Sequence, residues 1–297
     1  KEDIIAFCQF TDIVAEQKKW DEECILSDDV REWDNPYYGF PQMVRFAFNP
    51  GKEARAKLEQ LKSNGNTYAF SALFRPKSIK KAADDTHREF IYEKEVLDLF
   101  EIIDGSREDE ELLSFLDYDK IKEGHMCRHM VCVLPYCASC DALEKLLSEH
   151  KDKFKNLKDY TIINISGVDR PNEYRSVNAV KEKIAKCEAD GQKTITLTVN
   201  RMLTGSTVEQ WDTMLFFKDT ASPQEYDQAI FRLQNQYIKT FVDENGETIK
   251  YNMKPQTLLV DFDPHRIFYM QEQKSLIYNA NTENGGNQRL EERMREE

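Results

Sequence analysis

The alternation of apolar runs with helical segments after residue 125 constrains the fold of this chain most. Residues 129–135 form a continuous apolar run, which is typical of a strand covered on both faces, and residues 141–150 continue as a helix. The same alternation predicts further strands at 160–165, 194–199, 213–217 and 258–262, and helices at 176–189 and 223–233. Strands joined through helices favour a parallel sheet with helices on both faces. The sequence therefore predicts an α/β fold over residues 126–270.

The segments on either side follow other patterns. Residues 1–125 are predicted to be a mostly helical connector and insertion. A helix is expected to begin at about residue 265, and residues 271–297 are predicted to be a polar helical tail. Within the connector we expect one strand at 43–48 and helices at 52–63, 87–103 and 109–117. Residues 237–242 and 247–252 flank Asn245-Gly246, which predicts a β-hairpin.

Composition limits the classes of protein that this chain can belong to. With 297 residues, 40% of them hydrophobic, the chain can bury a core, and no apolar run approaches the roughly 18 residues of a membrane span. The start, Lys1-Glu2-Asp3, lacks the apolar region of a secretory signal, so we expect a cytoplasmic protein with no membrane partner. A net charge of -13 argues against a general polyanion binder. Any contact with nucleic acid must therefore use a local groove.

The cysteines do not predict a metal site. Seven cysteines, an odd number spread over a long chain, argue against a disulfide framework and favour reduced, buried side chains. Cys137 and Cys140 form one CxxC pair, but the second pair that a structural zinc site needs is absent. Two Glu-x-Lys strings, at 16–18 and 272–274, lie in predicted helices without a strand to orient them, which disfavours a nuclease site.

A complete nucleotide-hydrolysing site is not expected either. The string nearest to a phosphate loop, Pro50-Gly51-Lys52-Glu53, lacks the second glycine and the hydroxyl residue that hold phosphates and magnesium. The acidic strings at 21–24 and 109–112 follow polar residues instead of a buried strand, so they are interpreted as solvated helix ends.

Two strings do suggest a binding function. Residues 200–211 (NRMLTGSTVEQW) lie between two predicted strands, and residues 222–235 (SPQEYDQAIFRLQN) lie on the helix after the second of them. A loop of glycine and hydroxyl residues at the carboxyl ends of parallel strands is where α/β sheets bind ligands. Gln228 and Arg232 are four residues apart, so we expect them to share one helix face.

These two strings resemble motifs V and VI of superfamily two helicases, in the variant found in the ATP-driven motors of type I and type III restriction enzymes. Residues 129–135 with 140–143 resemble motif IV, and residues 163–167 resemble the strand and loop that follow it. Upstream, Trp20 and the strings at 35–37 and 40–43 look like the stretch after motif III. The resemblance implies the second RecA-like lobe of such a motor, and a chain that begins just past the first lobe.

The resemblance also implies roles for particular residues. Arg232 would be an arginine finger that meets the γ-phosphate, with Gln228 beside it in the cleft between lobes, because guanidinium is permanently charged and presents a fork of donors. ATP and Mg²⁺ would be bound mainly by the first lobe, with Gly205 and Thr207 close to the nucleotide. The pattern departs from the family at Asn235, where a second arginine is expected, and at Thr207, where an acid is usual.

DNA contacts are expected at the sheet edge. Small hydroxyls and backbone N–H groups suit phosphate oxygens, which favours Ser166, Gly167, Arg201 and Thr204 as contacts to a DNA strand. Ordinary turn chemistry is the alternative for these residues. The partners implied are double-stranded DNA, the N-terminal RecA-like lobe of the same protein, and methyltransferase or nuclease modules of a restriction system. The alternative function is a non-catalytic interaction module that keeps a RecA-like fold and binds another protein through its acidic surface.

Overall fold

The structure is a computed structural model. It describes residues 10–24, 30–47, 70–106, 115–117, 121, 126–169, 174, 176–199, 207–220 and 222–262. The helices expected at 52–63 and from about 265, most of the helix expected at 109–117, and the tail at 271–297 lie outside these ranges.

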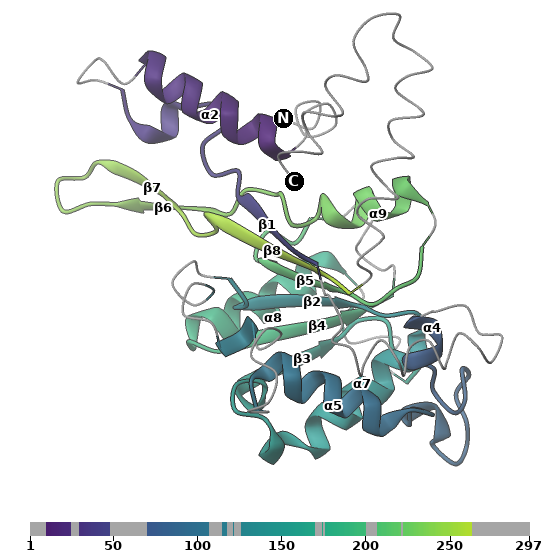
Figure 1. Ribbon diagram of the computed structural model, residues 1–297. Coiled ribbons are helices and arrows are strands. Elements are labelled where there is room, and N and C mark those ends of the chain that lie inside the picture. Colours follow the sequence, from purple (N-terminus) through teal and green to yellow (C-terminus); the bar gives the residue numbers. More distant parts are fainter. Residues whose placement is uncertain are drawn as a thin grey trace, which may run out of the picture.

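Six parallel strands form the central sheet (Figure 1). In spatial order they are β1 (Gln42–Ala47), β8 (Gln256–Asp261), β5 (Thr213–Phe216), β2 (His129–Val133), β4 (Lys193–Thr198) and β3 (Tyr160–Asn164). All five residues of β2 are buried, as expected for a strand in the middle of a sheet that is covered on both faces. The predicted α/β class with a parallel sheet and flanking helices is confirmed.

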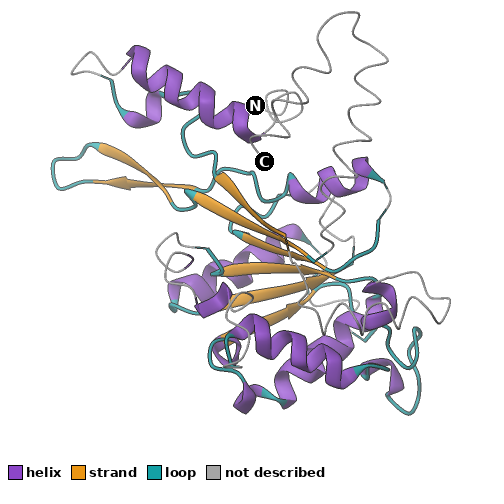
Figure 2. Cartoon of the chain, in the orientation of Figure 1, coloured by secondary structure: helices purple, strands orange, loops and turns teal. Residues whose placement is uncertain are grey.

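Helices cover both faces of the sheet (Figure 2). Side chains of α4 (Phe70–Leu73), α5 (Glu93–Asp104) and α7 (Cys137–Glu149) share one apolar cluster with Met130 and Cys132 of β2. The neighbouring residues Val131 and Val133 point to the opposite face, because side chains alternate along a strand. There they pack with α8 (Val177–Ala189) and α9 (Pro223–Ile230).

The N-terminal segment adds to the same sheet. The strand predicted at 43–48 is confirmed as β1, and it pairs in parallel with β8, more than 200 residues later in the chain. Helix α2 (Phe10–Cys24) lies next to this edge, where the Asn35 side-chain amide donates to the Gln17 carbonyl at 3.1 Å and to Asp21 Oδ1 at 2.8 Å. The boundary proposed at residue 125 stays a prediction.

The Asn-Gly hairpin is confirmed as β6 (Ile238–Val242) and β7 (Thr248–Asn252). Gly246 has a φ of 81°, a conformation that glycine adopts without steric cost. The ribbon projects beyond the sheet in Figure 1. Short 3₁₀ turns complete the described elements, at Glu32–Asp34, Thr86–Arg88, Phe115–Asp117, Lys151–Lys153 and Leu157–Asp159.

Three helix boundaries differ from the prediction. The helix expected at 141–150 begins at Cys137. The helix expected at 87–103 begins only at Glu93, because Phe90 forms an antiparallel bridge with Pro76 and His87 lies in a 3₁₀ turn. The helix expected at 223–233 ends at Ile230, and the Arg232 N–H bonds to the Ala229 carbonyl in the tighter pattern of a 3₁₀ turn. The inference that Gln228 and Arg232 share an α-helical face is therefore wrong in geometry, since only Gln228 lies within α9.

Most of the described cysteines are buried, as predicted, but Cys137 is exposed, so the expected core packing is wrong for this residue. Six are free, and four of these, at 127, 132, 140 and 187, are buried. Burial raises the pKa of Cys127, Cys132 and Cys140 above the ordinary thiol value, so these side chains pack as neutral groups.

Candidate functional site

The predicted contact residues Ser166 and Gly167 lie in the loop that follows β3, at the carboxyl edge of the sheet. The Ser166 hydroxyl is 3.1 Å from the Thr198 hydroxyl at the end of β4, and it accepts a hydrogen bond from the Val199 N–H at 3.3 Å. The loops after β3 and β4 are thus joined through one side chain. This is the edge where parallel α/β sheets bind ligands.

The backbone N–H groups of this loop are engaged within the protein. Asn164 Oδ1, at the end of β3, accepts the N–H of Ser166 at 3.3 Å and of Gly167 at 2.8 Å. This is an Asx-type turn, so turn chemistry accounts for both donors. A Cβ on Gly167 would lie 2.1 Å from Asp141 Oδ1, so the close approach of Asp141 requires glycine here. A DNA contact from Ser166 and Gly167 stays a prediction.

Asp141, in the first half of α7, holds the loop from inside the molecule. Its side chain accepts from the Asn164 amide at 3.0 Å and from the Val168 N–H at 2.6 Å. Glu144, one turn later, accepts from the same Asn164 amide at 3.0 Å. Burial raises the pKa of Asp141, and the nearby Asp169 and Glu144 charges raise it further.

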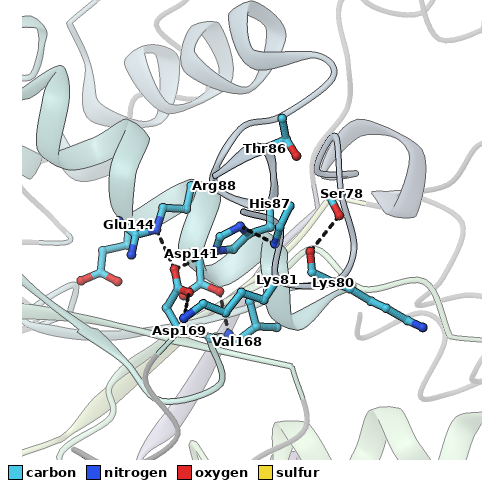
Figure 3. A network of polar contacts seen from close by, with 12 residues as sticks. Ser78, Lys80, Lys81, Thr86, His87, Arg88, Asp141, Glu144, Val168 and Asp169 are labelled. Atoms are coloured by element: carbon cyan, nitrogen blue, oxygen red, sulfur yellow. Dashed lines mark hydrogen bonds and ion pairs between the residues drawn. The ribbon is translucent and has the colours of Figure 1, made fainter. Parts of the chain in front are cut away.

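Asp169 holds the other end of the loop through three side chains from one segment (Figure 3). Its carboxylate, only 7% exposed, lies 2.8 Å from His87 Nε2, 2.6 Å from Arg88 Nε and 3.0 Å from Lys81 Nζ. Burial alone would raise its pKa, but the hydrogen bonds from His87, Arg88 and Lys81 outweigh that effect and hold the pKa well below its usual range. Asp169 is therefore ionised.

Helix α9 begins at the same edge. Its N-cap Ser222 accepts from the Glu225 N–H at 3.3 Å, and Glu225 binds Lys218 and Thr220 from the segment after β5. The Tyr226 hydroxyl donates to Asp261, the last residue of β8, at 2.6 Å. These contacts fix the start of α9 at the carboxyl ends of β5 and β8.

The predicted catalytic pair lies at the far end of this helix and just beyond it. Gln228 lies in the last turn of α9, and Arg232 follows two residues after the helix ends at Ile230, away from the end that is fixed at the carboxyl edge. Both Gln228 and Arg232 are partly buried. Burial lowers the pKa of Arg232 from its ordinary value, and the guanidinium stays charged.

Of the two residues predicted to lie near the nucleotide, the structure describes only Thr207. Thr207 is partly buried and directly precedes the buried residues Val208, Gln210 and Trp211. Arg201, Thr204 and Gly205 lie outside the described residues.

Sequence reasoning missed the residues that shape the loop after β3. His87 and Arg88 were expected in a helix, and Asp169 was not singled out, although it lies two residues after the string 163–167. No local spacing joins Asp169 to His87, because 82 residues separate them. In the parts of the chain that the structure describes, no group of three or more His, Cys, Asp or Glu side chains is arranged to hold a metal ion.

The fold and this edge define an α/β protein whose polar loops gather at the carboxyl ends of parallel strands. No family model matches the chain. The chain is 27% identical, over 239 residues, to a Mycoplasma pneumoniae protein named as a type II restriction enzyme and methyltransferase, RM.MpnORF110P C-terminus. That match covers 77% of this chain and 31% of the relative, so the chain spans less than a third of the relative's length.

A solved structure gives a weaker likeness. The C-terminal part of the Fun30 ATPase domain is 10% identical, with a TM-score of 0.31, and the match covers 85% of this chain and 60% of that one. A likeness of this size supports no further comparison. None of the helices that the structure describes is long and apolar enough to cross a membrane.

Proposed function

We propose that this chain is the second, RecA-like motor lobe of an ATP-dependent DNA translocase or helicase of a restriction-modification system. The observation that carries the proposal is the joining of the loops after β3 and β4 by Ser166. These are the loops in which the sequence predicts the DNA contacts Ser166, Gly167, Arg201 and Thr204. Similarity to a protein named as a restriction enzyme and methyltransferase supports the restriction system.

Arg232 is the proposed arginine finger. A partly desolvated guanidinium interacts more strongly with developing phosphate charge than one in water, because less solvent screens it. ATP and Mg²⁺ would be bound mainly by the N-terminal lobe, and Mg²⁺ would neutralise charge on the phosphates during hydrolysis. Gln228 would orient groups at the γ-phosphate from the last turn of α9, and Thr207 with Gly205 would lie near the nucleotide.

The test is the ATPase activity of the complete two-lobed protein. Arg232→Ala should leave DNA binding near normal and lower DNA-stimulated turnover roughly 10³- to 10⁵-fold, the range for arginine fingers. Arg232→Lys should rescue poorly because lysine lacks the fork of donors. Arg75→Ala, at an exposed arginine, is the matched control. A folded Arg232→Ala protein that keeps more than about a tenth of wild-type turnover would rule out the finger.

One observation favours the alternative, a non-catalytic interaction module. The β6–β7 ribbon exposes Phe241, Val242, Ile249 and Tyr251, with exposed fractions between 38% and 70%. Exposed apolar side chains on one projecting element are typical of a protein interface. If this is the main function, Phe241→Ser should abolish binding to a partner protein while every ATPase parameter of the complete protein stays at its wild-type value.

A further inference from the structure

Residues 77–89 form a closed loop that packs on the surface of α7. Its two ends meet where Pro76 bridges Phe90, and the Lys77 N–H donates to the Glu89 carbonyl at 2.8 Å. Phe74 and Phe90 pack edge to face beneath this closure, with ring centroids 6.0 Å apart. Lys145 of α7 reaches Glu89 at 3.3 Å. The 77–89 loop therefore has a fixed base from which its side chains can act on other segments.

The tautomer of His87 follows from its contacts. The Ala82 N–H donates to His87 Nδ1 at 3.2 Å, so Nδ1 carries no proton. The other ring nitrogen, Nε2, must then be the donor to Asp169 Oδ2 at 2.8 Å. His87 is fully buried, so its ring joins the 77–89 loop to the 165–169 loop by a hydrogen bond of defined direction.

Charge explains why the 165–169 loop needs this contact. Asp169 of the loop and Glu144 of α7 both lie close enough to Asp141 of α7 to raise its pKa by repulsion. Without cations, these like charges would push the 165–169 loop away from α7. Arg88 and Lys81 place two positive charges on Asp169, and the Asp141 charge also raises the pKa of Arg88. The 77–89 loop thus offsets the repulsion.

We infer that His87, Arg88 and Lys81 are positioning residues, which hold the 165–169 loop in the shape that presents Ser166 to a DNA strand. This inference rests on the proposed function. Asn164 and Asp141 fix the loop from inside, and the three side chains of the 77–89 loop fix it from outside. The 77–89 loop lies outside every motif-like string, so it is an addition to the motor that sets how its strand-contacting loop is held.

The first experiment measures backbone hydrogen exchange in this chain over residues 163–169. Arg88→Gln should speed exchange of the Gly167 and Val168 amides by roughly 10-fold or more, because one buried carboxylate loses its best partner. Arg88→Lys should restore part of the protection by keeping the charge. Lys77→Gln removes an exposed cation that pairs with Glu89 in the same loop, and it should leave exchange at these amides unchanged. Arg88 is 45% exposed, so the variant should fold.

The second experiment measures DNA-stimulated ATPase of the complete protein. In Arg88→Gln, the DNA concentration for half-maximal activity should rise roughly 10-fold with the maximal rate unchanged, which a general loss of stability would not produce. Unchanged exchange in Arg88→Gln overturns the inference whatever the DNA result. Faster exchange with an unchanged DNA requirement overturns the positioning role. No DNA stimulation in the wild-type protein overturns the proposed function instead, and the strand-presenting role with it, while the exchange result still reports on the contact between the two loops.

Discussion

Buried aspartates at the two edges of the sheet have pKa values shifted in opposite directions. At the carboxyl edge, Asp169 is met by the buried His87 and by Lys81 and Arg88, which reach solvent, and its pKa lies well below the usual range. At the amino edge, a row of polar side chains crosses neighbouring strands: Thr194, His129, Asp212 and Thr257. All four side chains are at least 97% buried. Burial lowers the pKa of His129 and raises that of Asp212, and both shifts favour the neutral form.

The amino edge depends on a buried lysine. Lys254, 2% exposed, donates to the carbonyls of Glu209 at 2.8 Å and Trp211 at 3.0 Å, and burial lowers its pKa to about 7. Burial likewise raises the pKa of Asp212 to about 6, although that carboxylate accepts the N–H groups of Arg128 and His129. Burial lowers the pKa of His129 to about 4.

The difference teaches that hydrogen bonds alone do not keep the pKa of a buried carboxylate below its ordinary value. Asp169 and Asp212 both accept hydrogen bonds, but only Asp169 has cations that stay partly hydrated, so they neutralise it without a large desolvation cost. The carboxyl edge thus holds its charges close to the surface, whereas the polar side chains of the amino edge form a buried layer.

The largest expected effect is at Lys254. Lys254→Met removes the lysine donor from two carbonyls and the positive charge that lowers the pKa of Asp212, so the free energy of unfolding near pH 6.5 should fall by roughly 3–5 kcal/mol. Urea unfolding measures it. Lys250→Met on β7, at an exposed lysine, is the control and should change stability by less than about 0.5 kcal/mol. A loss below about 1 kcal/mol at Lys254 would show that the amino edge does not depend on this ammonium.

The next largest effect is expected at His129, in the dependence of stability on pH. Its folded pKa of about 4 lies below the ordinary 6.5, so the unfolded chain takes up the proton first, and stability falls as pH drops through this window. His129→Gln should remove a destabilisation of about 3 kcal/mol at pH 4 relative to pH 7. Urea unfolding of wild type and variant at both pH values measures the difference.

Asp212 should act with the opposite sign. Its folded pKa of about 6 lies above the ordinary 3.8, so the folded chain takes up the proton first and gains stability as pH drops from 6 to 3.8. Asp212→Asn should remove that gain. If the free energies of unfolding of His129→Gln and Asp212→Asn change with acid pH in the same way as that of wild type, the description of the amino edge as a desolvated layer is wrong.

The smallest of these effects is expected at the carboxyl edge. Asp169→Asn should cost about 1–2 kcal/mol at neutral pH, because Lys81 and Arg88, 66% and 45% exposed, can return to water. A depressed folded pKa contributes stability that is complete above the ordinary value of 3.8 and is lost progressively as the pH falls from 3.8 towards the folded pKa. The stabilities of variant and wild type should therefore converge as the pH falls below 3.8 in urea titrations. Asp152→Asn, at an exposed aspartate, is the control, and a loss as large as that at Lys254 would remove the contrast between the edges.

Local patterns predicted much of the fold. The strands at 129, 160, 194, 213 and 258 and the Asn-Gly hairpin were expected within about two residues of their bounds, because apolar runs and turn residues act over a few positions. The start of α5 was misplaced because Phe90 and Ile91 fit a helical period. Phe90 instead closes a loop against Pro76, and Ile91 is 50% exposed.

The candidate site was predictable only in its chain positions. Ser166 and Gly167 follow an apolar strand, and that placement at the carboxyl edge could be inferred from the parallel order alone. Their partners could not be predicted, since Asp141 approaches Gly167 from helix α7 and Thr198 meets Ser166 from the neighbouring strand β4.

By itself, the sequence determined that this protein is an α/β protein with a parallel sheet and one hairpin, because periodicity and turn chemistry are local properties. Only the tertiary structure decided which polar groups meet. His87 lies 82 residues from Asp169, and Lys254 lies 43 from Trp211, in separations set by the strand order. A side chain's pKa depends on those neighbours and on its distance from water, so one aspartate has a lowered pKa at one edge of the sheet and another has a raised pKa at the other.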